Sequence, residues 1–128
     1  MGKRRIMVVD DALFMQNMLK NILEEMEYDV VGTASNGREA IEKVQTLNPE
    51  IITMDITMPD MDGIEALKEI KKINDQVKII MCSAMGQKNF VLEAVQSGAV
   101  DFIVKPFERS KIAKALNNVE TILRSEGR

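Results

Sequence analysis

Short runs of β-branched and other apolar residues alternate with longer segments of helical periodicity along the whole chain. Each short run is apolar enough to be buried on both faces, as a parallel sheet requires. Strands joined by helices run parallel with right-handed crossovers, and five such units are too few to close an eight-stranded barrel. The pattern therefore predicts an α/β fold with an open, doubly wound, five-stranded parallel sheet. The predicted strands are Ile6–Val9, Val30–Ala34, Ile51–Met54, Val77–Cys82 and Phe102–Val104.

The segments between these strands carry apolar residues at steps of three and four, which is typical of helices packed on a sheet. Asn36 and Asp62, each followed by glycine, are start signals for the second and third helices. Asn48 and Gly98 are stop signals for the second and fourth. The apolar stripes are Met15, Met18, Leu19, Ile22 and Met26, then Ala40, Ile41, Val44 and Leu47, then Ile64, Leu67 and Ile70, then Val91, Ala94 and Val95, and finally Ile112, Ala115, Leu116, Val119 and Leu123.

The chain has 128 residues, the size of one domain, and we expect a single domain over residues 1–128 with a core from about residue 3 to residue 123. Its 17 basic and 20 acidic side chains give a formal charge of −3, which offers no electrostatic footprint for nucleic acid or an anionic membrane. No apolar run approaches the roughly 18 residues needed to span a bilayer. We therefore expect a monomeric, cytoplasmic protein without nucleic acid partners or membrane insertion.

Two residue types that carry much of protein chemistry are missing or rare. The chain has no histidine, which excludes Ser-His and Cys-His nucleophile pairs and phosphohistidine chemistry within this chain. A single cysteine, Cys82, excludes an internal disulfide and a cysteine-rich zinc site. The chemistry that remains depends on carboxylates, hydroxyls and lysine.

Polar residues follow four of the predicted strands. Asp10 and Asp11 come directly after the first strand and Asp55 after the third, while Ser83 and Lys105 follow the fourth and fifth. The carboxyl ends of parallel strands meet at one edge of the sheet, where ligands bind. Three neighbouring carboxylates repel one another unless a cation intervenes, and an all-oxygen cluster suits a hard ion such as Mg²⁺, with Mn²⁺ as a substitute. Mg²⁺ held in this way keeps positions for phosphate oxygens, which Lys105 and Ser83 can also reach.

Each of these residues has an ordinary interpretation when it is taken alone. Asp10 and Asp11 can cap the first helix, and Asp55 can be a loop carboxylate. The combination of positions at the ends of several strands is what favours a site. No glycine-rich phosphate loop of the GxxxxGK[ST] or GxGxxG type occurs in the sequence, so a nucleotide is not expected as the direct phosphoryl donor.

The arrangement resembles that of response-regulator receiver domains, over roughly residues 3–123. The resemblance rests on the acidic pair in VVDDALF, on Asp55 in ITMDITMPDMDG, on Ser83, and on Lys105 and Pro106 in DFIVKPF, with Phe102 three residues before the lysine. With SAMGQ after the fourth strand and no output domain attached, the chain is most similar to the single-domain chemotaxis members of the family. The resemblance implies a flavodoxin-like strand order 2-1-3-4-5, which periodicity does not show, and a cis peptide bond between Lys105 and Pro106.

The resemblance also implies a role for each polar residue. Asp55 is the phosphoacceptor. Asp10, Asp11, Asp55 and the backbone carbonyl of Thr57 hold Mg²⁺. Lys105 pairs with the phosphoryl group. A carboxylate is already deprotonated at neutral pH, so the acceptor needs no general base, which fits a chain without histidine.

Signal transfer is implied to begin at Ser83 and Phe102. Ser83 is drawn toward the phosphoryl group and Phe102 turns into the space that it leaves, which remodels the face formed by the fourth helix, fifth strand and fifth helix. Thr57 and Met85 occupy positions where the family tunes the access of water to the phosphorylated aspartate, and hence its lifetime.

The fourth helix gives a separate indication of a partner surface. Phe90 and Leu92 lie on opposite flanks of its apolar stripe, which leaves a wider apolar arc than one sheet contact requires. Together with Phe102 they form a candidate surface for a partner.

The predicted function is that of a phosphoacceptor signalling protein, not an enzyme. The expected partners are a histidine kinase of the chemotaxis type, the flagellar motor switch protein and a phosphatase. One alternative is a single-domain phosphorelay intermediate with a non-flagellar partner. Another is an Mg²⁺-dependent phosphatase with an aspartate nucleophile, but such enzymes usually carry a second aspartate two residues after the first, where this chain has Thr57.

Overall fold

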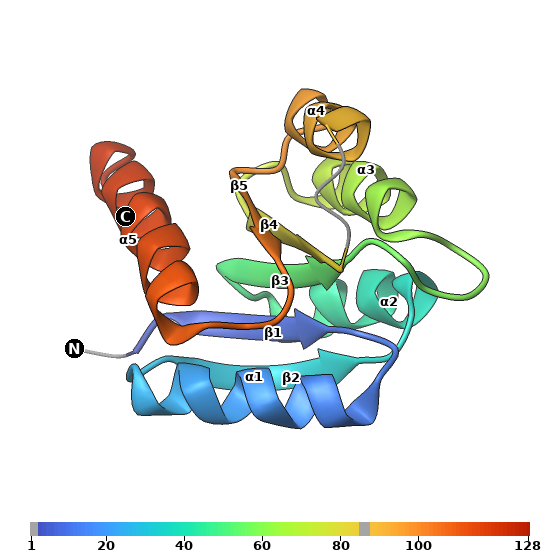
Figure 1. Cartoon of the computed structure of the whole chain (residues 1–128). Helices are drawn as coiled ribbons and strands as arrows, with labels where there is room; N and C mark the ends of the chain where they lie inside the picture. The colour runs from blue at the N-terminus through green and yellow to red at the C-terminus, as the bar shows by residue number, and fades with distance from the viewer. Residues whose placement is uncertain (1–2, 85–87) are drawn as a thin grey trace.

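The computed structural model describes residues 3–84 and 88–128, in which strands and helices alternate strictly (Figure 1). The strands are β1 (Arg5–Val9), β2 (Asp29–Ala34), β3 (Ile51–Asp55), β4 (Lys78–Ser83) and β5 (Asp101–Val104). The helices are α1 (Leu13–Glu25), α2 (Gly37–Leu47), α3 (Gly63–Ile73), α4 (Lys88–Gln96) and α5 (Arg109–Ser125). The ends of each predicted strand differ from the observed ends by at most one residue.

All neighbouring strands pair in parallel, and their order in the sheet is β2-β1-β3-β4-β5. Val8 of β1 is level with Thr53 of β3, which is level with Ile80 of β4. The predicted open, doubly wound sheet is therefore confirmed. The chain leaves β1 toward β2 on one side and later enters β3 on the other, so a crevice forms at the carboxyl ends of β1 and β3, where such folds bind ligands.

Helices cover both faces of the sheet (Figure 1). Helices α1 and α5 pack on one face, where Leu19 and Leu116 belong to the same apolar cluster as the strand residues. Helices α2, α3 and α4 pack on the other, where Leu67 and Ala94 belong to a second cluster. The central strand β3 is buried along its whole length, so the residue at its carboxyl end is held by a rigid frame.

The two edge strands are less buried than the sequence predicts. Most of β2 is only partly buried, and Val104 at the end of β5 is 36% exposed. The expectation of burial on both faces is therefore wrong for β2 and β5. Each of these strands has a neighbour on one side only, so their apolar runs reflect a half-covered position.

Helix α4 is rotated relative to the predicted apolar stripe. Ala94 is buried and Phe90 packs against the core, as expected of an inward face, but Val95 is 54% exposed. The assignment of Val95 to the buried stripe is wrong. Periodicity alone does not decide whether the Phe90 flank or the Leu92 flank of the stripe faces the core. Packing on the sheet turns the Phe90 flank inward.

The start and stop signals of the sequence act as predicted. The side chain of Asn36 accepts a hydrogen bond from the backbone N–H of Glu39 at the start of α2, and Asp62 accepts one from Glu65 at the start of α3. Each cap contributes about 1 kcal/mol to stability. Asn48 ends α2 in the left-handed conformation, with φ of 49°.

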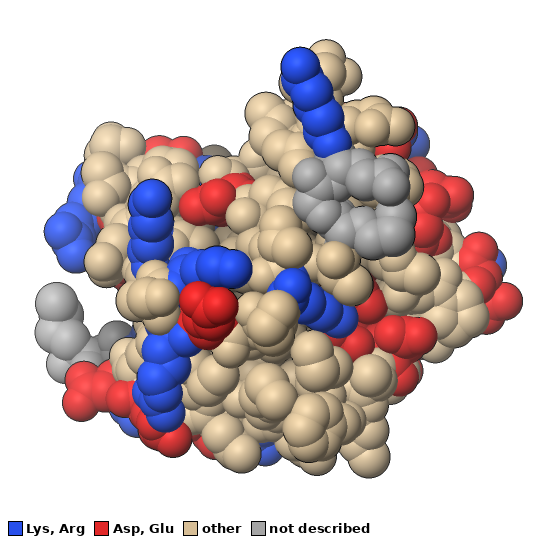
Figure 2. Space-filling view, in the orientation of Figure 1, with Lys and Arg blue, Asp and Glu red and all other residues tan. Residues whose placement is uncertain are grey.

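On the face shown in Figure 2, basic and acidic side chains are interspersed with uncharged ones over the part of the surface that is described. Among the residues that the structure covers, no helix combines the length and the apolar character that crossing a bilayer demands.

Candidate functional site

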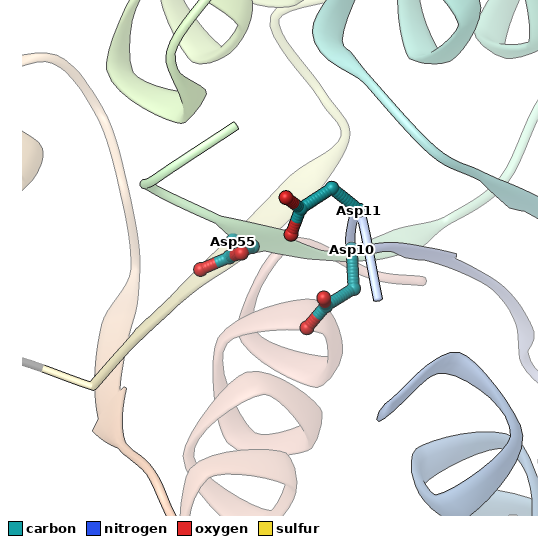
Figure 3. Close-up of side chains that lie close together, drawn as sticks. All are labelled: Asp10, Asp11 and Asp55. Carbon is teal, nitrogen blue, oxygen red and sulfur yellow. The ribbon is translucent and has the colours of Figure 1, made fainter. Parts of the chain in front are cut away.

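Three carboxylates lie together at the carboxyl edge of the sheet (Figure 3). Asp10 and Asp11 follow β1 and Asp55 ends β3, and one carboxylate oxygen from each lies within 4.8 Å of the others. Asp10 and Asp55 are buried, while Asp11 is exposed. The structure thus brings together the three acidic residues that the sequence placed at strand ends.

Asp10 is held by both its backbone and its side chain. Its backbone N–H donates to the carbonyl of Ala34 at 3.0 Å, and its carboxylate accepts a hydrogen bond from the N–H of Ala12 at 2.9 Å. Ala12, and neither aspartate, is the N-cap residue of α1, and Ala12 makes no side-chain capping hydrogen bond. The alternative that the acidic pair serves as a helix cap is therefore wrong.

The backbone that follows Asp55 at the end of β3 is fixed by hydrogen bonds to β4 and to the first residue of α3. The N–H of Ile56 donates to the carbonyl of Cys82 at 3.0 Å, and the N–H of Gly63 donates to the carbonyl of Ile56 at 2.7 Å. A Cβ atom at Gly63 would overlap the carbonyl oxygen of Asp55. Glycine at this position therefore allows the helix to approach the acidic residue closely.

Lys105 connects the acidic residues to β5. Its ammonium lies 2.7 Å from a carboxylate oxygen of Asp10 and 3.6 Å from one of Asp55. Its backbone N–H donates to the carbonyl of Ser83 at 2.7 Å, and its peptide bond to Pro106 is cis. Burial acts against the ammonium charge, but the hydrogen bond to Asp10 and the attraction of Asp55 outweigh it and raise the pKa of Lys105.

The cluster carries an excess of negative charge. Three carboxylates and one ammonium leave two uncompensated negative charges when all are ionised. Burial raises the pKa of Asp55 to about 6; Asp10 and Asp11 act in the same direction, while Lys105 opposes them. Ionised Asp55 is thus an energetically costly group in the absence of a counter-ion.

This donor set fits a small, hard divalent cation. All three groups offer carboxylate oxygens, the ligands preferred by Mg²⁺ and Mn²⁺. One oxygen from each carboxylate lies within 4.8 Å of the others, so the three groups converge on one small region. A cation there would also remove the repulsion among them.

The other residues singled out in the sequence surround this cluster to different degrees. Ser83 is buried at the end of β4, the strand next to β3. Thr57 is exposed two residues beyond Asp55. Met85 lies outside the described residues.

The three residues of the candidate partner surface have different surroundings. Phe90 and Phe102 are partly buried and pack against the core on the side of α2, α3 and α4. Leu92 is 52% exposed on α4. Of the three, Leu92 alone is largely open to solvent.

One buried polar residue of the site was missed from the sequence. Gln16 of α1 is only 4% exposed, and its amide donates to the backbone carbonyl of Asp10 at 2.6 Å. It occupies the same buried face of α1 as Leu19 and Leu23. The sequence did contain one indication of this role, because Gln16 is a polar residue at helical spacing from the apolar Leu19 and Leu23.

The family of the chain follows from comparison with known proteins. A family model described as the response regulator receiver domain matches residues 6–117. The chain therefore belongs to the response regulator receiver domain family.

Within that family the chain is similar to the chemotaxis protein CheY. It is 59% identical over 119 residues to the protein of that name from Thermotoga maritima, which covers 93% of this chain and 98% of the relative. It is 56% identical over 113 residues to the one from Bacillus subtilis, covering 88% and 94%. The chain is thus a CheY-like response regulator receiver domain.

Solved structures agree with this assignment. The chain superimposes with a TM-score of 0.87 on a chain of the CheX-CheY-BeF3-Mg²⁺ complex from Borrelia burgdorferi, at 36% identity and covering 91% of this chain and 88% of that one. The response regulator domain of Thermotoga maritima CheB gives a TM-score of 0.79 at 39% identity, covering 98% of both chains.

Proposed function

We propose that Asp55 accepts a phosphoryl group in an Mg²⁺-dependent reaction, and that this event switches a binding surface. The observation that carries the proposal is the buried Asp55 carboxylate, which lies beside two further carboxylates and 3.6 Å from the ammonium of Lys105. The excess negative charge of the carboxylates favours binding of a cation. The cation and the ammonium of Lys105 together favour binding of a phosphoryl group.

In the proposed step a carboxylate oxygen of Asp55 forms a bond to phosphorus while the bond from phosphorus to the donor breaks. The electron pair of the broken bond leaves with the donor. Mg²⁺, held by the three carboxylates and the backbone carbonyl of Thr57, would supply charge neutralisation for the phosphoryl oxygens. The pKa of about 6 leaves Asp55 largely ionised at neutral pH, so no general base is required.

Lys105 and Ser83 are the proposed protein contacts of the phosphoryl group. Lys105 is already at the cluster, and its ammonium can move from Asp10 to a phosphoryl oxygen with a small change in side-chain angle. Ser83 ends the strand adjacent to Asp55, which places a hydroxyl-bearing residue on the same edge. The exposed position of Thr57 supports a role in water access, and Met85 keeps the same proposed role.

The proposed donor is the phosphohistidine of a histidine kinase of the chemotaxis type. The chain has no histidine of its own, so a phosphohistidine donor must lie on another protein. In this proposal the single receiver domain is a signalling protein in the cytoplasm that assists only its own phosphorylation and dephosphorylation. A separate phosphatase would shorten the lifetime of the phosphorylated state.

The proposed output is the face of α4, β5 and α5, with the flagellar motor switch protein as its target. Phe102 lies on β5 beside a groove that is also lined by Val104, Lys111 and Lys114. Leu92 adds an exposed apolar side chain on α4. A phosphoryl group replaces one negative charge by about two, which is a sufficient local change to alter Ser83 and Phe102.

Intact-mass labelling with acetyl phosphate and Mg²⁺ tests the acceptor. We expect one added phosphoryl group on the unmodified chain and none on Asp55→Asn. Asp60→Asn is the matched control, because Asp60 is an exposed acidic residue in the following loop and its left-handed backbone, with φ of 70°, tolerates asparagine. Equal labelling of the Asp55 variant would remove Asp55 from the reaction.

Binding of a flagellar-switch peptide tests the output. A CheY chain has been solved in a complex that contains BeF3 and Mg²⁺, so the same pair is a suitable phosphoryl mimic for this chain. We expect peptide binding with the mimic and much weaker binding without it. Absence of binding in both states would favour the phosphorelay alternative over the chemotaxis role.

A further inference from the structure

Gln16 is a buried polar side chain whose presence the phosphoryl reaction does not by itself explain. It is 4% exposed and lies with Leu19 and Leu23 among the buried residues of α1. An apolar residue would suit such a position, because burying a carboxamide costs free energy unless its polar atoms are hydrogen-bonded. The partners of this amide therefore indicate what it does.

The amide nitrogen of Gln16 reaches three oxygen atoms beside the acidic cluster. It lies 2.6 Å from the backbone carbonyl of Asp10, 3.1 Å from the hydroxyl of Ser35 and 3.4 Å from the backbone carbonyl of Ala34. Backbone carbonyls can only accept hydrogen bonds, so the nitrogen end of the amide must face them. The shortest of the three bonds is the one to Asp10.

The carbonyl of Asp10 belongs to the peptide unit that joins the two acidic residues after β1. A peptide unit is planar, so fixing its oxygen also fixes the direction in which the chain enters Asp11. On the other side of Asp10, the backbone N–H is bonded to the carbonyl of Ala34 at 3.0 Å. Asp11 is exposed, so the direction of its side chain depends on the backbone that precedes it.

We propose that Gln16 is a positioning residue of the divalent-cation site, which it serves by orienting the Asp10–Asp11 peptide. The inference rests on the proposed Mg²⁺ site. Groups that orient metal ligands without contacting the metal typically contribute about 10- to 100-fold to metal affinity. Loss of the Gln16 donor is therefore expected to weaken Mg²⁺ binding without a comparable effect on the fold.

Gln16→Met tests this, because methionine has similar length and no donor. Gln45→Met is the matched control, since Gln45 is exposed on α2 and its amide nitrogen donates to the carbonyl of Ile41 in the same helix. Isothermal titration with Mg²⁺ should show a dissociation constant raised about tenfold or more for Gln16→Met and unchanged for Gln45→Met. Urea unfolding in EDTA, followed by circular dichroism, confirms that each variant is folded at the titration temperature.

A spectroscopic measurement separates positioning from a general loss of structure. In ¹H–¹⁵N spectra without metal, Gln16→Met should shift the amide signal of Asp11, because the hydrogen bond to the carbonyl of its own peptide unit is lost. Signals of β4 and β5 should stay in place. An unchanged Mg²⁺ affinity, or shifts spread over the whole sheet, would overturn the proposal.

Two further variants complete the test. Gln16→Asn is one methylene shorter, so it also loses the Asp10 contact and should show the same loss of affinity if the methionine variant does not fold. Asp10→Asn tests the cation site itself. If Mg²⁺ binding is insensitive to Asp10→Asn, the proposed metal site fails; if it depends on Asp10 but not on Gln16, only the positioning role fails.

Discussion

Replacing Asp55 with asparagine in the metal-free protein should stabilise the fold at neutral pH. Asn is an uncharged analogue of the protonated acid, so the variant removes one of the two uncompensated negative charges of the cluster. Burial, with Asp10 and Asp11, raises the pKa of Asp55 from its ordinary value of 3.8 to about 6. Since each pH unit of displacement is worth about 1.4 kcal/mol, ionised Asp55 costs the native state about 3 kcal/mol.

The direction in which pH changes the free energy of unfolding depends on whether the native or the unfolded state binds the proton of Asp55 more tightly. The native state holds the proton of Asp55 up to about pH 6, whereas the unfolded chain releases it near its ordinary value of 3.8. The free energy of unfolding of the parent protein should therefore fall as the pH rises from about 4 to about 6, relative to Asp55→Asn. The variant should be more stable by about 2 to 3 kcal/mol at neutral pH, and the difference should vanish near pH 4.

Urea denaturation followed by circular dichroism measures this difference, first in EDTA and then in Mg²⁺. If Mg²⁺ binds only the native state, as proposed, it stabilises the parent protein and should narrow or reverse the difference in stability between the parent and Asp55→Asn. Glu42→Gln, an exposed position on α2, is the control and should change stability by less than about 0.5 kcal/mol. Equal stability of Asp55→Asn and the parent in neutral EDTA buffer, or a gap that persists at pH 4, would refute the electrostatic reasoning.

Three further substitutions test other parts of the site. Gly63→Ala places a methyl group against the carbonyl of Asp55 and should lower the free energy of unfolding by about 2 kcal/mol or more in urea; an unaffected protein would show that α3 can move away. Asp62→Ala removes the side-chain cap of α3 and should cost about 1 kcal/mol in the same assay, and no loss would contradict the cap. Lys105→Met removes the ammonium that competes with a cation for Asp10, so calorimetry should show tighter Mg²⁺ binding; weaker binding would mean that the lysine organises the cluster instead.

The strands were predictable from the sequence because the composition and length of each run of residues are enough to identify it as a strand. A run such as Ile51–Met54 is short, apolar and rich in β-branched residues, which favours a buried strand over a helix, and the structure extends it only to Asp55. Periodicity contains no information on which strands are neighbours, so the order came from the resemblance alone. The rotation of α4 exposes Val95 and packs the partly buried Phe90 against the core; it depends on tertiary packing and could not be predicted from the spacing of the apolar residues.

The site was predictable to the extent that it depends on strand ends. The topology of a parallel sheet brings Asp10, Asp11 and Asp55 to one edge, whatever the details of the loops. The direct ion pair of Lys105 with Asp10 was not predicted, because it crosses two intervening strands and depends on the reach of one side chain. Gln16 was missed for the same reason, since its partners lie in loops that only the folded chain brings near α1.

Charge is arranged differently at the two edges of the sheet. At the amino edge, Arg4 bonds to Glu50 at 2.9 Å and to Glu120 at 3.0 Å, so α5 is tied to the sheet by paired charges. Burial opposes ionisation of Glu50, but its bonds to Arg4 and to the adjacent backbone lower its pKa, so this carboxylate stabilises the fold when charged. At the carboxyl edge three carboxylates share Lys105, and the raised pKa of the central one means that its charge destabilises the fold. An ionised carboxylate thus stabilises the fold at the amino edge, at Glu50, and destabilises it at the carboxyl edge, at Asp55. A cation bound at the carboxyl edge, as proposed, would relieve the repulsion among its three carboxylates and so would stabilise the native state.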